Sequence, residues 1–156
     1  MKVAVISDLH LGRGDTVDIF GHDDAEFLRF LDHLEDNFER VVLLGDVYET
    51  LTAVNPWRQY EEYQAAKAAH PEIVARFDRP QYRYIHGNHD LIASHVDGAA
   101  TQLELKADGT RLLFCHGHGY DIYSAFRQRA SEFIAWVGGW VLRFGLRAAY
   151  RAMAKI

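Results

Sequence analysis

The chain has 156 residues, of which 49% are hydrophobic and 25% charged, and its formal net charge is −5. This length and composition predict one folded globular protein with a real hydrophobic core, and the chain shows no internal repeat or low-complexity segment. The longest uncharged apolar stretch, Phe133 to Leu142, is far short of the ~20 residues that a membrane-spanning helix needs. Because the chain opens in a strand rather than in a secretion signal, we expect a cytoplasmic protein.

Charge is distributed unevenly along the chain. Residues 1 to 124 contain 11 Lys and Arg against 21 Asp and Glu, a net charge of −10, whereas residues 125 to 156 contain 6 against 1, a net charge of +5. The acidic body argues against a nucleic-acid partner, because such partners usually bind a basic face. The two parts are therefore expected to face different partners.

The first predicted elements are a strand and a helix. An apolar strand covers residues 3 to 6. Apolar side chains at helical spacing then run from Phe27 to Phe38, with Asp23 or Asp24 as the residue that caps the helix. This helix is expected to pack on the sheet to which the strand belongs.

The next elements repeat this alternation. A second strand at residues 40 to 44 leads to a helix that starts at Pro56, breaks or restarts at Pro71 and continues to Phe77. A third strand covers residues 82 to 85. Alternation of strands and helices predicts an α/β fold with a parallel sheet and right-handed crossovers.

The second half of the chain has a different pattern. Residues 101 to 105 and 111 to 115 read as two strands joined by a turn at Ala107-Asp108-Gly109, which is a hairpin signal. Beyond Tyr120 we expect no strand, only two helices joined or kinked near Gly138-Gly139 and Gly145.

Four polar motifs follow four apolar runs directly, each at the point where a strand is expected to end. They are Asp8-Leu9-His10, Gly45-Asp46-Val47-Tyr48-Glu49, Gly87-Asn88-His89-Asp90 and His116-Gly117-His118. Because the carboxyl ends of parallel strands lie along one edge of a sheet, we expect these side chains to meet there. Carboxylates and imidazoles brought within a few ångström of each other predict a metal site.

Two metal ions are expected, with Asp46 between them. A carboxylate can bridge two cations about 3.5–4 Å apart, the separation used for in-line displacement at phosphorus. Asp8 and His10, as residues i and i+2 at a strand end, would share one ion, and Asn88 and His116 would take the other. Mixed oxygen and imidazole ligands suit Mn²⁺, Fe, Co²⁺, Ni²⁺ or Zn²⁺. A water between the ions would lose a proton near neutral pH and become the nucleophile.

The order and wording of the motifs resemble those of the calcineurin-like metallophosphoesterases, over residues 3 to 121. The resemblance implies the first half of an α/β/β/α sandwich and hydrolysis of a phosphomonoester, phosphodiester or pyrophosphate. It places metal ligands at Asp8, His10, Asp46, Asn88 and His116. It makes His89 the general acid, with Asp90 orienting its imidazole. His118 could reach a metal, the substrate phosphate or only solvent.

The sequence departs from this family in one respect. Its members close with a Gly-His-x-His segment, and this chain has no histidine after His118. Three explanations stay open: the chain is a fragment, a partner subunit supplies the missing ligands, or the site works with open positions. We therefore expect residues 1 to 119 to be an incomplete phosphoesterase core and residues 120 to 156 a helical cap or lid.

The aromatic and Arg-rich segment gives the best hint of a substrate. It looks like the acyl-chain cap of the UDP-2,3-diacylglucosamine hydrolases, which implies a lipid-linked nucleotide and contact with the inner membrane face through residues 121 to 156. Self-association through the same residues is the other expectation. A different class of function, an inactive metal-binding scaffold with an interaction helix, also stays open.

The remaining histidines are not expected to take part in the site. His22, His33, His70 and His95 lie outside the motifs and are predicted to be surface residues. His86 precedes a motif glycine and is expected to pack against the sheet.

Overall fold

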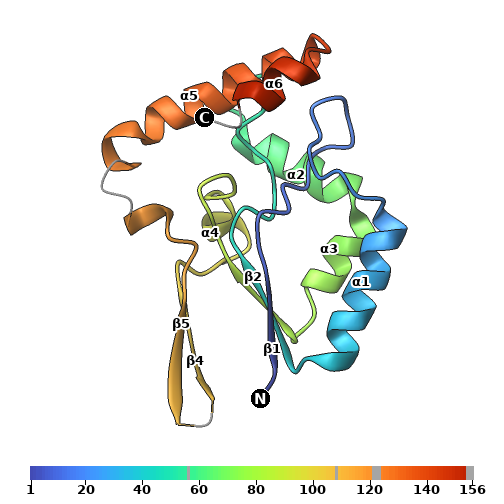
Figure 1. Ribbon diagram of the computed structural model, residues 1–156, viewed down its shortest axis with the longest axis vertical. Helices are drawn as coiled ribbons and strands as arrows, with labels where there is room; N and C mark the ends of the chain where they lie inside the picture. The colour runs from blue at the N-terminus through green and yellow to red at the C-terminus, as the bar shows by residue number, and fades with distance from the viewer. Residues whose placement is uncertain (56, 108, 121–123, 154–156) are drawn as a thin grey trace.

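The computed structural model describes residues 1 to 55, 57 to 107, 109 to 120 and 124 to 153 (Figure 1). Its centre is a parallel three-stranded sheet with strand order β1-β2-β3. The strands are β1 (Val3–Ile6), β2 (Arg40–Leu44) and β3 (Tyr82–Ile85). Val3 pairs with Arg40 and Val41 with Tyr82, so the three strands end at almost the same level. The predicted α/β fold with a parallel sheet is confirmed.

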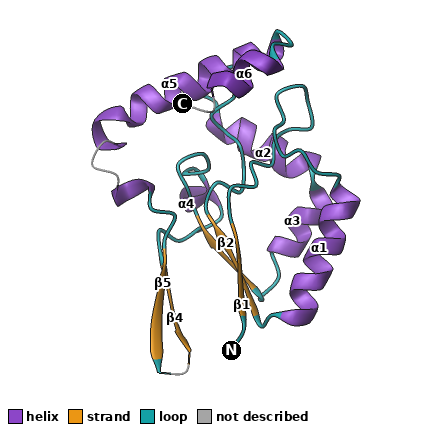
Figure 2. Ribbon diagram, in the orientation of Figure 1, coloured by secondary structure: helices purple, strands orange, loops and turns teal. Residues whose placement is uncertain are grey.

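Three helices lie along one side of this sheet, α1 (Asp24–Asn37), α2 (Gln59–Ala69) and α3 (Pro71–Phe77) (Figure 2). Their buried side chains form one core with the strands, and this core includes Phe27, Leu31, Tyr63 and Ile73. Burial of such a side chain contributes about 1.5–3 kcal/mol, so this core provides much of the stability of the sheet.

The ends of these helices follow the expected signals with one exception. Asp23 caps α1, because its side chain accepts a hydrogen bond from the backbone of Glu26. Pro71 restarts the chain as α3, as predicted. The helix expected from Pro56 begins instead at Gln59, and Pro56 lies outside the described residues.

The hairpin forms a sheet of its own. β4 (Leu103–Ala107) and β5 (Thr110–Phe114) pair antiparallel and are not hydrogen-bonded to the parallel sheet (Figure 1). The interpretation of all four motifs as the ends of neighbouring parallel strands is therefore wrong for the fourth one. A Gly-containing turn favours antiparallel pairing with the preceding strand, because a parallel pair needs a long crossover.

Two helices close the described chain, α5 (Ser124–Arg143) and α6 (Arg147–Met153). The chain breaks between them at Gly145, which has a φ of 75°, but α5 runs through Gly138-Gly139 without interruption. The predicted pair of helices joined near these glycines is confirmed, and the join lies at Gly145 rather than at Gly138-Gly139. Along the described residues, no helix combines the length and apolar character needed to cross a membrane.

His70 is not the surface residue that its position outside the motifs predicted. It lies at the junction of α2 and α3 and is 7% exposed. Its Nδ1 hydrogen-bonds Asp24 at 2.8 Å, and its Nε2 lies 3.6 Å from Asp18. The Asp18 carboxylate, with a further contribution from Asp24, raises the pKa of His70 above its usual value against the effect of burial. His70 thus ties the loop after β1 and the first turn of α1 to the α2–α3 junction.

This arrangement gives stability a pH dependence. Because the folded-state pKa of His70 is raised, its stabilising effect is present below its ordinary pKa of 6.5 and is lost as pH rises through the folded value. We expect His70→Gln to lower the free energy of unfolding by about 1–2 kcal/mol near pH 6 and by less near pH 9. Urea unfolding at both pH values checks this, with His33→Gln, on an exposed residue, as control. Equal losses at both pH values would contradict it.

Candidate metal centre

The loops after β1 and β2 continue to pair beyond the strand ends. The Asp8 N–H donates to the Gly45 carbonyl at 3.1 Å, and the His10 N–H donates to the Asp46 carbonyl at 3.0 Å. Leu11 continues this parallel pairing as far as Tyr48. The backbone register therefore fixes the first motif against the second.

Three residues of these loops adopt an unusual backbone conformation. Asp8, His10 and Asp46 have φ values of 54°, 50° and 51°, and they are the non-glycine residues with positive φ in the described chain. Because β1 ends at Ile6, Asp8 and His10 lie beyond the strand. Their side chains are therefore not brought to one face by strand alternation, as the i and i+2 spacing suggested. Left-handed backbone at such residues is strained and clusters at functional sites.

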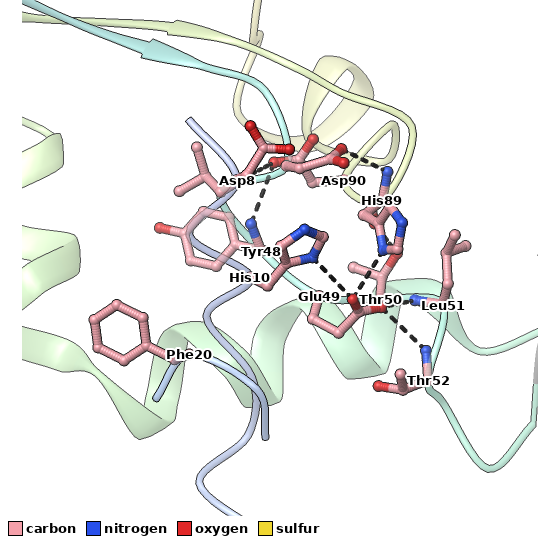
Figure 3. Close-up of polar contacts among 12 residues, drawn as sticks. Asp8, His10, Phe20, Tyr48, Glu49, Thr50, Leu51, Thr52, His89 and Asp90 are labelled. Atoms are coloured by element: carbon pink, nitrogen blue, oxygen red, sulfur yellow. Dashed lines mark hydrogen bonds and ion pairs between the residues drawn. The ribbon is translucent and has the colours of Figure 1, made fainter. Parts of the chain in front are cut away.

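The same three residues form a compact set of potential metal ligands. One ligand atom from each of Asp8, His10 and Asp46 lies within 4.8 Å of the others (Figure 3 shows Asp8 and His10). Asp46 is buried and Asp8 is exposed, so the group lies at the edge of the protein interior. His116 approaches the group from the hairpin, with its Nε2 3.6 Å from an Asp46 oxygen and 3.9 Å from an Asp8 oxygen. Four of the five predicted ligands thus meet in one place.

Two motif glycines make this close approach possible. A Cβ at Gly87 would lie 2.0 Å from Oδ1 of Asp46, and a Cβ at Gly45 would lie 2.3 Å from the His116 ring. Any other residue at either position would displace the Asp46 carboxylate or His116. The site therefore requires glycine at positions 45 and 87.

Glu49 belongs to the second motif, but the sequence analysis assigned it no role. Its side chain is 1% exposed, and its Oε2 accepts hydrogen bonds from Nδ1 of His10 at 3.0 Å and from Nδ1 of His89 at 2.8 Å (Figure 3). Its Oε1 accepts the backbone N–H groups of Leu51 and Thr52. Burial opposes its ionisation, but these bonds outweigh burial and lower the pKa of Glu49 to about 2.

Glu49 determines which ring nitrogen carries a proton in His10 and in His89. An ionised carboxylate only accepts hydrogen bonds, so both imidazoles carry a proton on Nδ1. This leaves Nε2 of His10 free to bind a metal, as is usual for a ligand whose other nitrogen is fixed by a carboxylate. The two rings lie edge to face, with centroids 4.6 Å apart.

Among the described residues, the His89 imidazole hydrogen-bonds Glu49 and not Asp90, so Asp90 does not orient this ring directly, although its charge helps to raise the pKa of His89. The Asp90 carboxylate is fully buried and accepts from the backbone N–H groups of Val47, Tyr48 and Gly87 and from the Tyr84 hydroxyl. It therefore holds the loops together, whereas Glu49 makes the hydrogen bond to His89. The signal for Glu49 in the sequence was its position, three residues after Asp46 in the second motif. Once the fold buries this acid, it needs hydrogen-bond partners.

The electrostatics of His89 suit proton donation. Burial alone would lower the pKa of His89, but its hydrogen bond to Glu49 and the negative charges of Glu49, Asp46 and Asp90 outweigh burial, so the pKa is raised. His89 is thereby kept charged to a higher pH than an ordinary histidine. The backbone N–H of His89 donates to Oδ1 of Asp46 at 2.9 Å, which fixes its distance from the metal-ligand group.

The remaining predicted site residues are Asn88 and His118. Asn88 lies half-buried in the loop after β3, between Gly87 and His89.

His118 opens a short 3-10 helix, η1 (His118–Tyr120), so it is not a strand neighbour of His116. The Nδ1 atoms of His116 and His118 are 3.2 Å apart. Burial, together with the neighbouring His116 and His86, lowers the pKa of His118. As expected, His86 is buried.

The family model of the calcineurin-like phosphoesterase superfamily domain matches residues 1–135. Among solved structures, the chain is similar to a conserved uncharacterized protein from Streptococcus pneumoniae, a predicted phosphoesterase, at 20% sequence identity and a TM-score of 0.39. The similarity covers 83% of this chain and 56% of that one, so this chain spans little more than half of its length. No curated protein matches.

Proposed function

The chain belongs to the calcineurin-like phosphoesterase superfamily, and from this premise we propose that it is a dinuclear metal-dependent phosphoesterase. Proteins of this superfamily are hydrolases that bind divalent metal ions. The observation that carries the proposal is the meeting of Asp8, His10, Asp46 and His116 in one partly buried group. An uncompensated group of this kind would be electrostatically costly, so it fits bound cations.

The ligands divide between two cations in this proposal. Asp8, His10 and Asp46 would hold one ion, and Asp46, Asn88 and His116 would hold the other. Bound cations would supply charge stabilisation for phosphoryl oxygens and would lower the pKa of water. The chain itself supplies the strained loops that aim these ligands and the glycines that leave room for them.

His89 is the general acid in this proposal. It would protonate the leaving oxygen from Nε2, because Nδ1 is engaged by Glu49. Glu49 stabilises the charged imidazole and holds its orientation. A positioned general acid contributes ~10²–10⁴-fold to the rate.

Turnover of bis-p-nitrophenyl phosphate tests the proposal. Chelation and dialysis should remove the activity, and added Mn²⁺ should restore it, because the ligand group would then be emptied and refilled. A chain that binds Mn²⁺ but hydrolyses neither this diester nor p-nitrophenyl phosphate would favour the alternative, an inactive metal-binding scaffold.

A lipid-linked nucleotide is the substrate class that one observation favours. The rings of Phe133, Trp136 and Trp140 in α5 and of Phe144 just after its end form a continuous stripe, with neighbouring centroids 5.7, 6.3 and 6.1 Å apart. Phe133 and Phe144 are 61% and 73% exposed, whereas Trp136 and Trp140 are half-buried. Exposed aromatic side chains beside basic ones suit an anionic lipid surface. In this proposal residues 120 to 156 are a cap on the core of residues 1 to 119.

Vesicle binding checks this part of the proposal. The chain should sediment with vesicles that contain anionic lipid, and Phe133→Asp should reduce the bound fraction. A chain that stays monomeric and ignores these vesicles would remove the reason for placing it at a membrane.

A further inference from the structure

The segment after Glu49 is buried although it contains no helix or strand. Thr50, Leu51, Thr52 and Ala53 are each at most 6% exposed. Leu51 and Ala53 do not belong to the core between the sheet and helices α1 to α3. Another part of the molecule must therefore cover them.

Helix α5 provides this cover through a close backbone contact. A Cβ at Gly139 would lie 2.9 Å from the Thr52 carbonyl oxygen and 3.1 Å from its Cα. Real Cβ atoms essentially never lie under 3.0 Å from another heavy atom, so a larger residue at position 139 would shift α5 or residue 52. Figure 1 shows α5 crossing above the end of the sheet where this segment runs.

Two side chains of α5 bind the same segment. Arg143 donates from Nη2 to the Thr52 carbonyl at 2.6 Å, and Trp136 donates from Nε1 to the Val54 carbonyl at 3.2 Å. The guanidinium also lies over the Trp140 ring, 5.5 Å from its centroid, which restricts its rotation. Two carbonyls of this irregular segment, those of Thr52 and Val54, thus have partners on α5.

The opposite side of the segment faces Glu49 and His89. The N–H groups of Leu51 and Thr52 bind Oε1 of Glu49 at 2.8 and 3.2 Å, and the Thr50 hydroxyl donates to the His89 carbonyl (Figure 3). Two backbone N–H groups of the segment therefore bind the site, and two of its carbonyls bind α5. Displacing Thr52 would move the N–H groups that hold Glu49, and Glu49 holds His10 and His89.

From these contacts we propose that α5 is a positioning element of the site, with Gly139 and Arg143 as its positioning residues. They act through Thr52 and Glu49 on the imidazole of His89 and touch neither substrate nor metal. The inference deepens the proposed function and rests on it for its kinetic prediction only. It gives α5 a role in the chemistry that is independent of what its exposed aromatic residues contact.

The first test needs no metal and no activity. In the metal-free chain, ¹H–¹⁵N spectra of the histidine rings report the hydrogen bonds at Nδ1 of His10 and His89. We expect Arg143→Ala and Gly139→Ala to shift or broaden the His89 signal and to accelerate exchange of its Nδ1 proton. Arg143→Lys keeps one donor and should restore part of the wild-type signal. Ile134→Ala, on a residue of α5 that is 58% exposed, should leave the signal unchanged.

The second test is kinetic. A mispositioned general acid should matter most when the leaving group is poor, so Arg143→Ala should lower kcat roughly 10- to 100-fold for an alkyl phosphoester and less for a p-nitrophenyl ester. Equal losses for both esters, or an unchanged His89 signal in both the Arg143 and Gly139 variants, would overturn the proposal. An inactive wild-type chain would instead refute the proposed function, and the spectra would still decide the role of α5.

Discussion

Asp46→Asn is expected to abolish phosphoesterase activity and to reduce metal binding at both positions. Asparagine has nearly the same shape, and its oxygen could still accept the His89 N–H, but it loses the negative charge and one of the two oxygens that would bridge the cations. The loss should exceed the ~10–100-fold that follows removal of a ligand's hydrogen-bond partner, because Asp46 is proposed to be itself a ligand of both ions. Turnover of bis-p-nitrophenyl phosphate and metal analysis after dialysis measure the two effects.

Asp36→Asn is the matched control for this variant. Asp36 is exposed near the end of α1, so the same change of charge should leave turnover and metal content unaltered. An Asp46→Asn chain that binds as much metal as the wild type would contradict the role proposed for Asp46.

His89→Ala is expected to keep the metals and to lose turnover. The loss should reach ~10²–10⁴-fold for alkyl esters, because their leaving oxygen needs a proton, and should be much smaller for p-nitrophenyl esters. Steady-state kinetics with both ester types measure the loss of turnover. In the metal-free chain the pKa of His89 is raised, so NMR titration should find its imidazole charged above the ordinary histidine pH range.

His95→Ala serves as the control, since His95 is exposed on α4 (Ala93–Val96). If His89→Ala slowed both ester types equally, His89 would be a positioning residue rather than the acid. If His89→Ala also lost metal, the imidazole would support the metal ligands as well, because its partner Glu49 also binds His10.

The sequence predicted the parallel sheet and the residues that gather at its end. Periodicity and the position of polar residues after apolar runs are local features, and they survive in the fold as β1 to β3 and the loops that follow them. The hairpin was also predictable from its turn, but its separation from the parallel sheet was not, because strand order depends on long-range packing.

The details of the site depended on such long-range contacts. Asp90 and Glu49 are both acidic residues within motifs, and only the fold decides that the first binds backbone N–H groups while the second binds two histidines. Likewise, Gly139 looked like a helix breaker, whereas it lies inside α5 at the point of contact with Thr52. Tertiary contact can override the low helix propensity of glycine, which costs only about 1 kcal/mol.

Electron paramagnetic resonance of the Mn²⁺-loaded chain tests most directly whether Asp46 joins two metal ions in one site. Two ions that share a bridging carboxylate at about 3.5–4 Å interact magnetically. We predict an exchange-coupled, multiline spectrum in the wild-type chain that disappears in Asp46→Asn. A spectrum of isolated Mn²⁺ alone, unchanged by Asp46→Asn at full metal loading, would contradict the account.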